Sequence, residues 1–188
     1  MSPYLEDRLK ANWKFLFANM PDGNLNIQCG DGWYSILDVL CESLFNLHEN
    51  CGEYDHGFLY DVDPADCGGL LKIYMDPPSL VSLSLTEQFG ILCISYRYEY
   101  SDTILKLAKM MDGSKAKYPE IANALAHNRY LAHADGCVAY AENLSTRICE
   151  FSGLSGVLHR SEAGWYRTLN PEVAKTTYIN QGFVPVEK

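Results

Sequence analysis

The segment that most constrains the fold is a turn followed by an amphipathic helix at residues 29–44. Its first six residues are Cys29-Gly30-Asp31-Gly32-Trp33-Tyr34, where the glycines permit a tight turn and Asp31 can cap the following helix. From Trp33 onward, apolar residues recur every three or four positions: Trp33, Ile36, Leu37, Leu40, Cys41 and Leu44. This spacing predicts a core helix with one continuous buried stripe.

The rest of the chain predicts an α+β fold. Apolar residues at helical spacing predict a first helix from Pro3 to Met20. Alternating patterns predict strands at 58–62, 71–75, 81–85 and 89–98, and their short connections predict one antiparallel sheet of about four strands. Helical spacing returns at 101–111 and from Glu120 towards Phe151, so N-terminal helices and a long C-terminal helix should flank the sheet.

Size and composition favour a single globular domain. The 188 residues are 47% apolar and 21% charged, and no apolar run approaches the roughly 20 residues that cross a bilayer. The first residues lack the features of a signal peptide. Seven cysteines, an odd number without a Cys-x-x-Cys pair, favour reduced thiols. We therefore expect a cytoplasmic protein, with a core domain at 1–152 and a mostly irregular tail at 153–188 packed on it.

Charge is distributed unevenly along the chain. The formal net charge is −9, but residues 1–94 alone carry −10 and residues 95–188 carry +1. Between Phe15 and Leu71 there are ten acidic residues and no Lys or Arg. The negative electrostatic potential of such a run repels nucleic acid and attracts basic protein surfaces. A solvated face that only improves solubility is the alternative interpretation.

The acidic run also contains aromatic residues that could anchor a protein contact, although partial burial explains a tyrosine equally well. The predicted partner-binding residues are Glu49, Glu53, Tyr54, Asp55, Tyr60, Asp61, Asp63 and Asp66. Three of these carboxylates alternate at 61, 63 and 66, but this stretch lacks the glycine and final glutamate of a calcium loop. An exposed acidic edge is the preferred interpretation.

No motif in the chain predicts a reaction, a cofactor or a metal. Gly30-Asp31-Gly32 lacks the third glycine and the Lys-Ser/Thr of a phosphate-binding loop, so a turn with a helix cap is expected. His133 and Cys137 stand four residues apart on one helical face. They could form a dyad or a ligand pair, but without a third partner we expect buried structural residues. No catalytic residue is predicted, and an enzyme without a readable motif stays open.

Three parts of the chain carry a family resemblance. They are Cys29 to Tyr34, then Leu85-Thr86-Glu87-Gln88-Phe89-Gly90-Ile91-Leu92, and last Cys149-Glu150-Phe151-Ser152-Gly153-Leu154-Ser155-Gly156 with Gly164-Trp165-Tyr166-Arg167-Thr168-Leu169. Together they resemble an uncharacterised family of tailed-phage proteins with a Cys-Gly-Asp-Gly-Trp-Tyr segment, a Lys-Glu-Lys-Phe-Gly-Gly-Leu-Arg-Phe-Tyr strand and a C-terminal zinc-knuckle-like tail. The resemblance extends from about Leu5 to Ala174. Its structural motif residues here are Cys29, Gly30, Asp31, Gly32, Trp33, Tyr34, Phe89, Gly90 and Trp165.

The resemblance implies a degenerate metal site. Cys149 stands where the family has its first ligand, but Ser152, Asn170 and Val173 stand where the others are expected. Because structural zinc needs about four good ligands, the metal should be lost, with packing around Trp165 in its place. The strand has also lost its basic residues. The family implies a phage setting and supplies no established activity.

Four hypotheses about function remain. The first is a phage-encoded acidic binding protein that mimics nucleic acid and inhibits a host defence protein with a basic surface, as an anti-CRISPR would, with no direct contact to nucleic acid or membrane. The second is a sponge for nucleotide signals that uses the arginines of the C-terminal half: Arg97, Arg129, Arg147, Arg160 and Arg167. The third is the enzyme without a readable motif, and the fourth a toxin-immunity or accessory phage protein.

Overall fold

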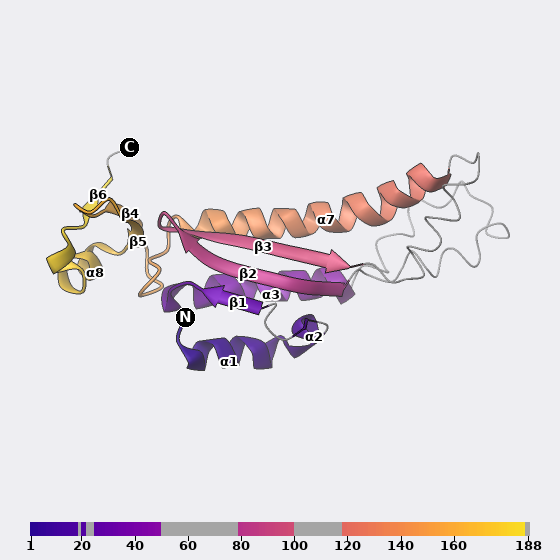
Figure 1. The fold of residues 1–188 in the computed structure, drawn as a ribbon, viewed down its shortest axis with the longest axis horizontal. Coiled ribbons are helices and arrows are strands. Elements are labelled where there is room, and N and C mark those ends of the chain that lie inside the picture. The colour runs from indigo at the N-terminus through magenta and orange to yellow at the C-terminus, as the bar shows by residue number, and fades with distance from the viewer. Residues whose placement is uncertain (19, 22–24, 50–78, 100–117, 187–188) are drawn as a thin grey trace.

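A computed structural model describes residues 1–18, 20–21, 25–49, 79–99 and 118–186 (Figure 1). These residues form helices and two small sheets, which confirms the α+β class. The elements are α1 (Pro3–Asn12), α2 (Lys14–Phe17), β1 (Leu25–Gln28), η1 (Asp31–Trp33), α3 (Tyr34–Glu49), β2 (Ser79–Gln88), β3 (Ile91–Glu99), α7 (Tyr118–Ser145), β4 (Val157–Arg160), β5 (Tyr166–Leu169), α8 (Pro171–Thr176), η4 (Ile179–Gln181) and β6 (Val184–Pro185).

The first sheet has the strand order β1-β2-β3 in the part of the chain that the structure describes. β2 and β3 form the expected antiparallel hairpin, whereas β1 pairs parallel to β2, with Leu25 opposite Leu83. The prediction of a purely antiparallel sheet was therefore wrong. A parallel pair needs a long crossover connection, and α3 lies in that connection. The strands predicted at 58–62 and 71–75, like the helix predicted at 101–111, lie outside the described residues.

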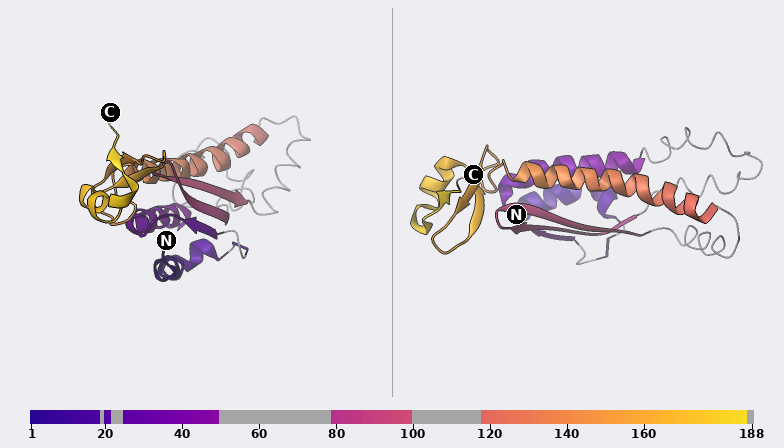
Figure 2. Two further views of the ribbon diagram at one scale, coloured as in Figure 1. Left: turned by 60° about the vertical axis from the view of Figure 1, so that its left-hand side comes forward. Right: turned by 90° about the horizontal axis from the view of Figure 1, so that it is seen from above.

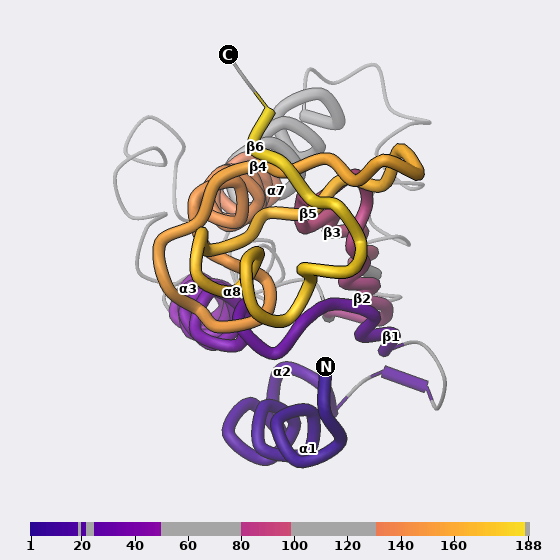
Figure 3. Tube along the Cα trace, turned by 90° about the vertical axis from the view of Figure 1, so that its left-hand side faces the viewer, coloured from indigo at the N-terminus to yellow at the C-terminus, as the bar shows by residue number. Residues whose placement is uncertain are grey.

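The main core lies between this sheet and two helices. α3 and α7 lie side by side on one face of the sheet, and α1 lies near the β1 edge (Figure 3). All six residues of the predicted α3 stripe are buried, together with inward-facing residues of the hairpin such as Leu85 and Leu92. Burial of each such aliphatic side chain contributes roughly 1.5–3 kcal/mol. The stripe was thus predicted correctly from its spacing.

The helix boundaries differ from the prediction at two points. The first helix breaks at Trp13 (φ −113°, ψ 32°) and continues as the short α2. α3 begins through the 3-10 turn η1, and the Asp31 carboxylate accepts a hydrogen bond from the Ser2 backbone N–H. The expected cap was therefore wrong, because Asp31 holds the residue before α1 instead of the first turn of its own helix.

Side chains of α7 cover the open edge of β3. Glu142 Oε1 accepts the Ile94 N–H at 2.8 Å, and Ser145 Oγ accepts the Leu92 N–H at 2.9 Å. These are the N–H groups that an additional strand would need. In the described ranges the sheet therefore ends at β3, where a four-strand sheet was expected.

Residues after 152 are more regular than predicted. They form a second three-stranded sheet of order β5-β4-β6 with α8 and η4. A small core of Cys149, Leu169 and Ala174, with Tyr178 and Phe183 beside it, holds this C-terminal unit together. The expectation of a mostly irregular tail is corrected, because strands this short give little periodic signal. The unit lies at the end of the first sheet where the β2–β3 hairpin turns (Figures 1 and 2).

None of the described helices combines the length and the apolar composition that a membrane span requires.

Candidate functional site

The predicted partner-binding residues fall mostly outside the part of the chain that the structure describes. Glu49, the last residue of α3, is exposed. The remaining seven lie in the stretch 50–78, outside the described residues: Glu53, Tyr54, Asp55, Tyr60, Asp61, Asp63 and Asp66. Within the structure, the acidic run is therefore represented chiefly by α3.

The carboxylates of α3 point away from its buried stripe. At 100° per residue, Asp38, Glu42 and Glu49 fall within about 40° of one another, on the side opposite the stripe. Asp38 accepts a 2.7 Å hydrogen bond from Trp13 Nε1, while Glu42 and Glu49 are exposed. No ion pair with either glutamate occurs among the described residues. This acidic face of α3, defined by these three residues, can receive cations from a partner.

The first family-like segment, residues 29–34, contacts the segment around Cys149. The Gly32 N–H donates to the Glu150 carbonyl at 2.9 Å, and Trp33 Nε1 donates to the Ile148 carbonyl at 2.8 Å. A Cβ on Gly32 would lie 2.2 Å from the Cys149 carbonyl oxygen, so a side chain cannot be accommodated there. The structure thus brings the first and third family-like segments together in a packing contact.

The second family-like segment contains the tip of the β2–β3 hairpin. Phe89 (φ 54°) and Gly90 (φ 77°) form a two-residue turn between Gln88 and Ile91, so the strand predicted at 89–98 begins two residues later. The Gly90 carbonyl accepts a 2.7 Å hydrogen bond from Thr168 Oγ1. A Cβ on Gly90 would lie 2.8 Å from the Arg167 Cα. The hairpin tip is therefore docked directly on β5.

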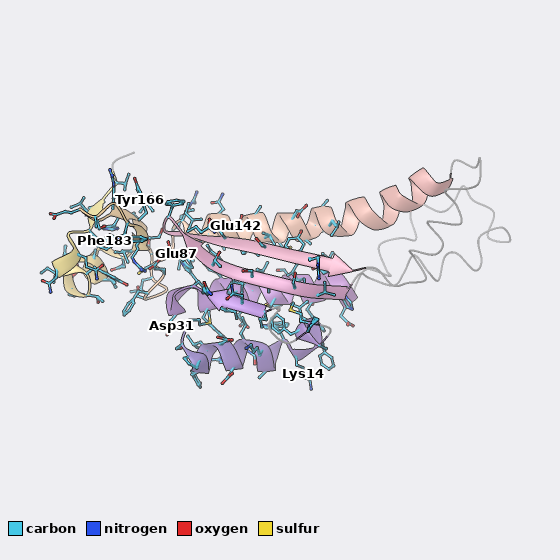
Figure 4. All side chains as sticks on the ribbon, viewed as in Figure 1. Lys14, Asp31, Glu87, Glu142, Tyr166 and Phe183 are labelled. Carbon is cyan, nitrogen blue, oxygen red and sulfur yellow. The ribbon has the colours of Figure 1, made fainter. Side chains whose placement is uncertain are left out.

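An aromatic patch borders this docked tip. Phe89 is 75% exposed and lies edge-to-face against Tyr166, with 6.4 Å between ring centroids. The Arg160 guanidinium lies 5.6 Å from the centre of the Tyr166 ring, and Figure 4 places Tyr166 beside the hairpin tip. Trp165 is 72% exposed. The expectation that packing around Trp165 replaces a metal was wrong, since Leu169 and its neighbours form the core there.

Cys149 is a buried thiol with several hydrogen-bond donors around it. It is fully buried, and its Sγ accepts the Ser152 N–H at 3.4 Å. Burial raises the pKa of Cys149, but hydrogen bonds from the Ser152 side chain and from the backbone N–H groups of Asn170, Ser152 and Phe151 outweigh it and lower the pKa overall. The Asn170 side chain is already hydrogen-bonded at both ends. Its Oδ1 accepts the Glu172 N–H, which caps α8, and its Nδ2 donates to the Ser155 carbonyl.

Metal-ligating residues do not gather elsewhere in the described ranges. No group of three or more His, Cys, Asp or Glu there could hold a metal ion. The thiol of Cys149 therefore has hydrogen-bond donors, not other ligands, around it in this part of the chain.

A pocket lies between α3 and α7. Its volume is about 280 Å³, and it is lined by Ile36, Val39, Leu40, Ser43, His133, Gly136, Cys137, Tyr140, Ala141 and Leu144. His133 and Cys137 do share this lining, as their spacing predicted. His133 is exposed and Cys137 half-buried, so the expectation that both are buried was wrong for His133. Burial raises the pKa of the Cys137 thiol, which keeps it protonated near neutral pH.

The described arginines considered for a nucleotide site are dispersed. None of Arg97, Arg147, Arg160 and Arg167 lines the pocket, and the side chain of Arg129 lies outside what the structure describes. Arg160 and Arg167 lie on opposite faces of the β4–β5 pair, and Arg167 forms an ion pair with the buried Glu150. The described residues thus provide no phosphate-binding cluster at this pocket.

Comparisons with protein-family models, with curated proteins and with solved structures find no match to this chain.

Sequence reasoning missed the pocket, the docked hairpin tip and the edge cover of β3. Each of these depends on contacts between segments far apart in the chain. Only Gly136, a glycine inside a long helical pattern, was a local signal that could have pointed to the pocket.

Proposed function

We propose that this chain is a phage-encoded acidic binding protein that inhibits a host defence protein by covering its nucleic-acid-binding surface. The observation that carries the proposal is the run of ten acidic residues without Lys or Arg from Phe15 to Leu71. A run of one charge sign resembles a phosphate array in the field that it creates. The phage setting rests on the family resemblance of the three segments described above.

The geometry of α3 supports this proposal. Asp38, Glu42 and Glu49 share the face opposite the buried stripe, on a helix held in the core along its length. Successive acids along that face are separated by about 6 Å and about 10 Å of helix rise. A helix fixed by its apolar side presents such charges without further ordering, and this preorganisation favours binding to a basic groove.

The same charges favour fast and salt-dependent association. Carboxylates that no described Lys or Arg neutralises attract cationic partners over about a Debye length, roughly 10 Å at 0.1 M salt. Complementary charge mainly raises the association rate and selects among partners. A host effector with a positively charged nucleic-acid channel, such as a CRISPR effector, fits this description.

A toxin with a basic surface would be bound for the same reason, which keeps an immunity role as the second candidate. A nucleotide sponge has weaker support, because no described arginine or lysine side chain lines the α3–α7 pocket.

The test begins with a pull-down from host lysate at about 50 mM and about 300 mM salt, followed by identification of proteins retained only at low salt. The key variant is Glu42→Lys with Glu49→Lys. One carboxylate about 6 Å from a cation in water contributes roughly 0.7 kcal/mol of attraction. Replacing it with lysine turns this attraction into an equal repulsion, a change of about 1.4 kcal/mol per site. The double variant should therefore weaken binding by about 3 kcal/mol, or roughly 100-fold in Kd.

The matched control is Glu162→Lys with Glu172→Lys, which changes net charge equally on the C-terminal unit. It should bind within a few fold of the wild type. Equal loss for both variants would mean that only net charge matters, and no loss for the α3 variant would remove α3 from the interface. Inhibition of the retained protein's nucleic-acid binding then separates a defence inhibitor from an immunity protein.

A further inference from the structure

The α3–α7 pocket has the composition of a binding site for an uncharged molecule. Its floor and walls come from apolar side chains of both helices, including Ile36, Leu40 and Leu144. Its volume of about 280 Å³ corresponds to about nine water molecules at roughly 30 Å³ each. This space suits a molecule with two or three aromatic rings. Pockets for small ligands are typically apolar with a few polar groups, as here.

Exposed apolar side chains mark the mouth of the pocket on both helices. Val39 on α3 is 51% exposed, and Tyr140 on α7 is 63% exposed. Both belong to the lining, so their exposure keeps the pocket open to solvent. A ligand in the pocket would bury them and remove this apolar surface from water.

Gly136 supplies an independent observation. It lies inside the 28-residue helix α7, where glycine costs roughly 1 kcal/mol relative to alanine. A Cβ built on Gly136 would meet no atom within 4 Å, so no packing in the described structure requires a glycine there. Gly136 belongs to the pocket lining. Close approach of a ligand to the helix backbone would explain its presence.

The lining also indicates the charge of the ligand. Among the residues that the structure describes, it contains no Lys, Arg, Asp or Glu, and its polar groups are Ser43, His133, Cys137 and Tyr140. The Ser43 hydroxyl already donates to the Val39 carbonyl at 2.8 Å. Burial of a charged group without a counter-charge is costly. The net charge of −9 disfavours an anion further.

We propose that the α3–α7 pocket binds a small, uncharged, largely aromatic molecule, with its ring against Gly136 and between Val39 and Tyr140. This site is independent of the acidic face of α3, because its lining includes none of the three acids that define that face. It does not rest on the proposed inhibitory function.

The first test uses two fluorescent probes with the same ring systems. N-phenyl-1-naphthylamine is neutral, and 1-anilinonaphthalene-8-sulfonate carries one negative charge. Titration of each into the full chain should give saturable binding of the neutral probe, at least about tenfold tighter than that of the sulfonate. Absence of saturable binding by the neutral probe, or equal affinity for both probes, would overturn the proposal.

Variants then locate the probe. Gly136→Leu places a side chain in the pocket and should weaken the neutral probe at least about tenfold while raising the melting temperature, because leucine is a better helix former. Ala139→Leu is the control, since Ala139 is exposed on the same helix but absent from the lining. Val39→Asp, at an exposed mouth position, should also weaken the probe.

Unchanged probe affinity in Gly136→Leu and Val39→Asp would refute the site. A lower melting temperature for Gly136→Leu would mean that the space is already filled in the protein, which would also refute it. These outcomes are distinct from loss of partner binding, which Glu42→Lys with Glu49→Lys tests and which this site does not require.

Discussion

Substitution of the glycine at the hairpin tip tests how the C-terminal unit is attached. In Gly90→Ala, alanine must adopt φ +77°, which costs about 1–2 kcal/mol. Its Cβ would also lie 2.8 Å from the Arg167 Cα and 2.9 Å from the Arg167 carbonyl carbon, both backbone atoms that side-chain rotation cannot move. Relief of this contact must move the hairpin tip and β5 apart.

The size of the effect is the sum of three costs, of which the backbone strain is the first. Overpacking of this kind costs about 1–3 kcal/mol, and loss of the hydrogen bond between Thr168 and the Gly90 carbonyl adds about 1 kcal/mol. Gly90→Ala should therefore lower the free energy of unfolding by about 3–6 kcal/mol. For a chain of this length, that corresponds to a fall of roughly 6–24 °C in melting temperature.

Gly164→Ala is the matched control. Gly164 also has a positive φ (+86°) in the β4–β5 turn, but a Cβ there would meet nothing within 4 Å. It should therefore cost only the backbone term of about 1–2 kcal/mol. Urea denaturation of both variants measures the difference. Equal losses for Gly90→Ala and Gly164→Ala would refute the docking of the hairpin tip on β5.

Three further predictions concern the core. Trp33→Phe should cost about 2–4 kcal/mol in urea denaturation, because it removes ring atoms from a buried site and leaves the Ile148 carbonyl without its donor; a loss below about 1 kcal/mol would contradict the contact. Ser145→Ala should lower the free energy of unfolding by about 1–3 kcal/mol and speed hydrogen exchange of the Leu92 amide, because that amide loses its acceptor. Unchanged exchange would show that α7 does not cover that edge of β3. Burial raises the pKa of Cys29 to about 11 and that of Cys41 to about 12, from an ordinary value of 9.0. The folded state therefore keeps protons that the unfolded state loses, so the free energy of unfolding should fall as pH rises above about 9, by roughly 1.4 kcal/mol per pH unit for each thiol. Cys41→Ala should make this slope shallower by roughly 1.4 kcal/mol per pH unit, and an equal slope in both proteins would contradict the burial of Cys41.

Local patterns predicted the parts of the fold that depend on near neighbours. The buried stripe of α3 and the β2–β3 hairpin follow from the 3.6 and 2.0 periods of their apolar residues. The position of the turn was missed by two residues. Phenylalanine rarely adopts a positive φ, so Phe89 was assigned to a strand and not to a turn.

Features that depend on distant segments could not be predicted. β1 pairs parallel with β2, and no local pattern of four residues encodes a partner so far along the chain. Nothing in the sequence distinguishes Glu142 and Ser145 from other polar residues of a helix. Their role in covering β3 follows only from their contacts with it. Of the candidate site, the acidic character was evident from the sequence alone, whereas the pocket at Gly136 requires α3 and α7 to be placed side by side.

Competition with nucleic acid tests the proposed function most directly. A host protein retained at low salt would be bound to a labelled oligonucleotide, and the chain would be added while release of the oligonucleotide is followed by fluorescence anisotropy. We expect displacement by the wild type and by Glu162→Lys with Glu172→Lys, but a roughly 100-fold higher midpoint for Glu42→Lys with Glu49→Lys. Simultaneous binding of the chain and the oligonucleotide to that protein would contradict the proposal.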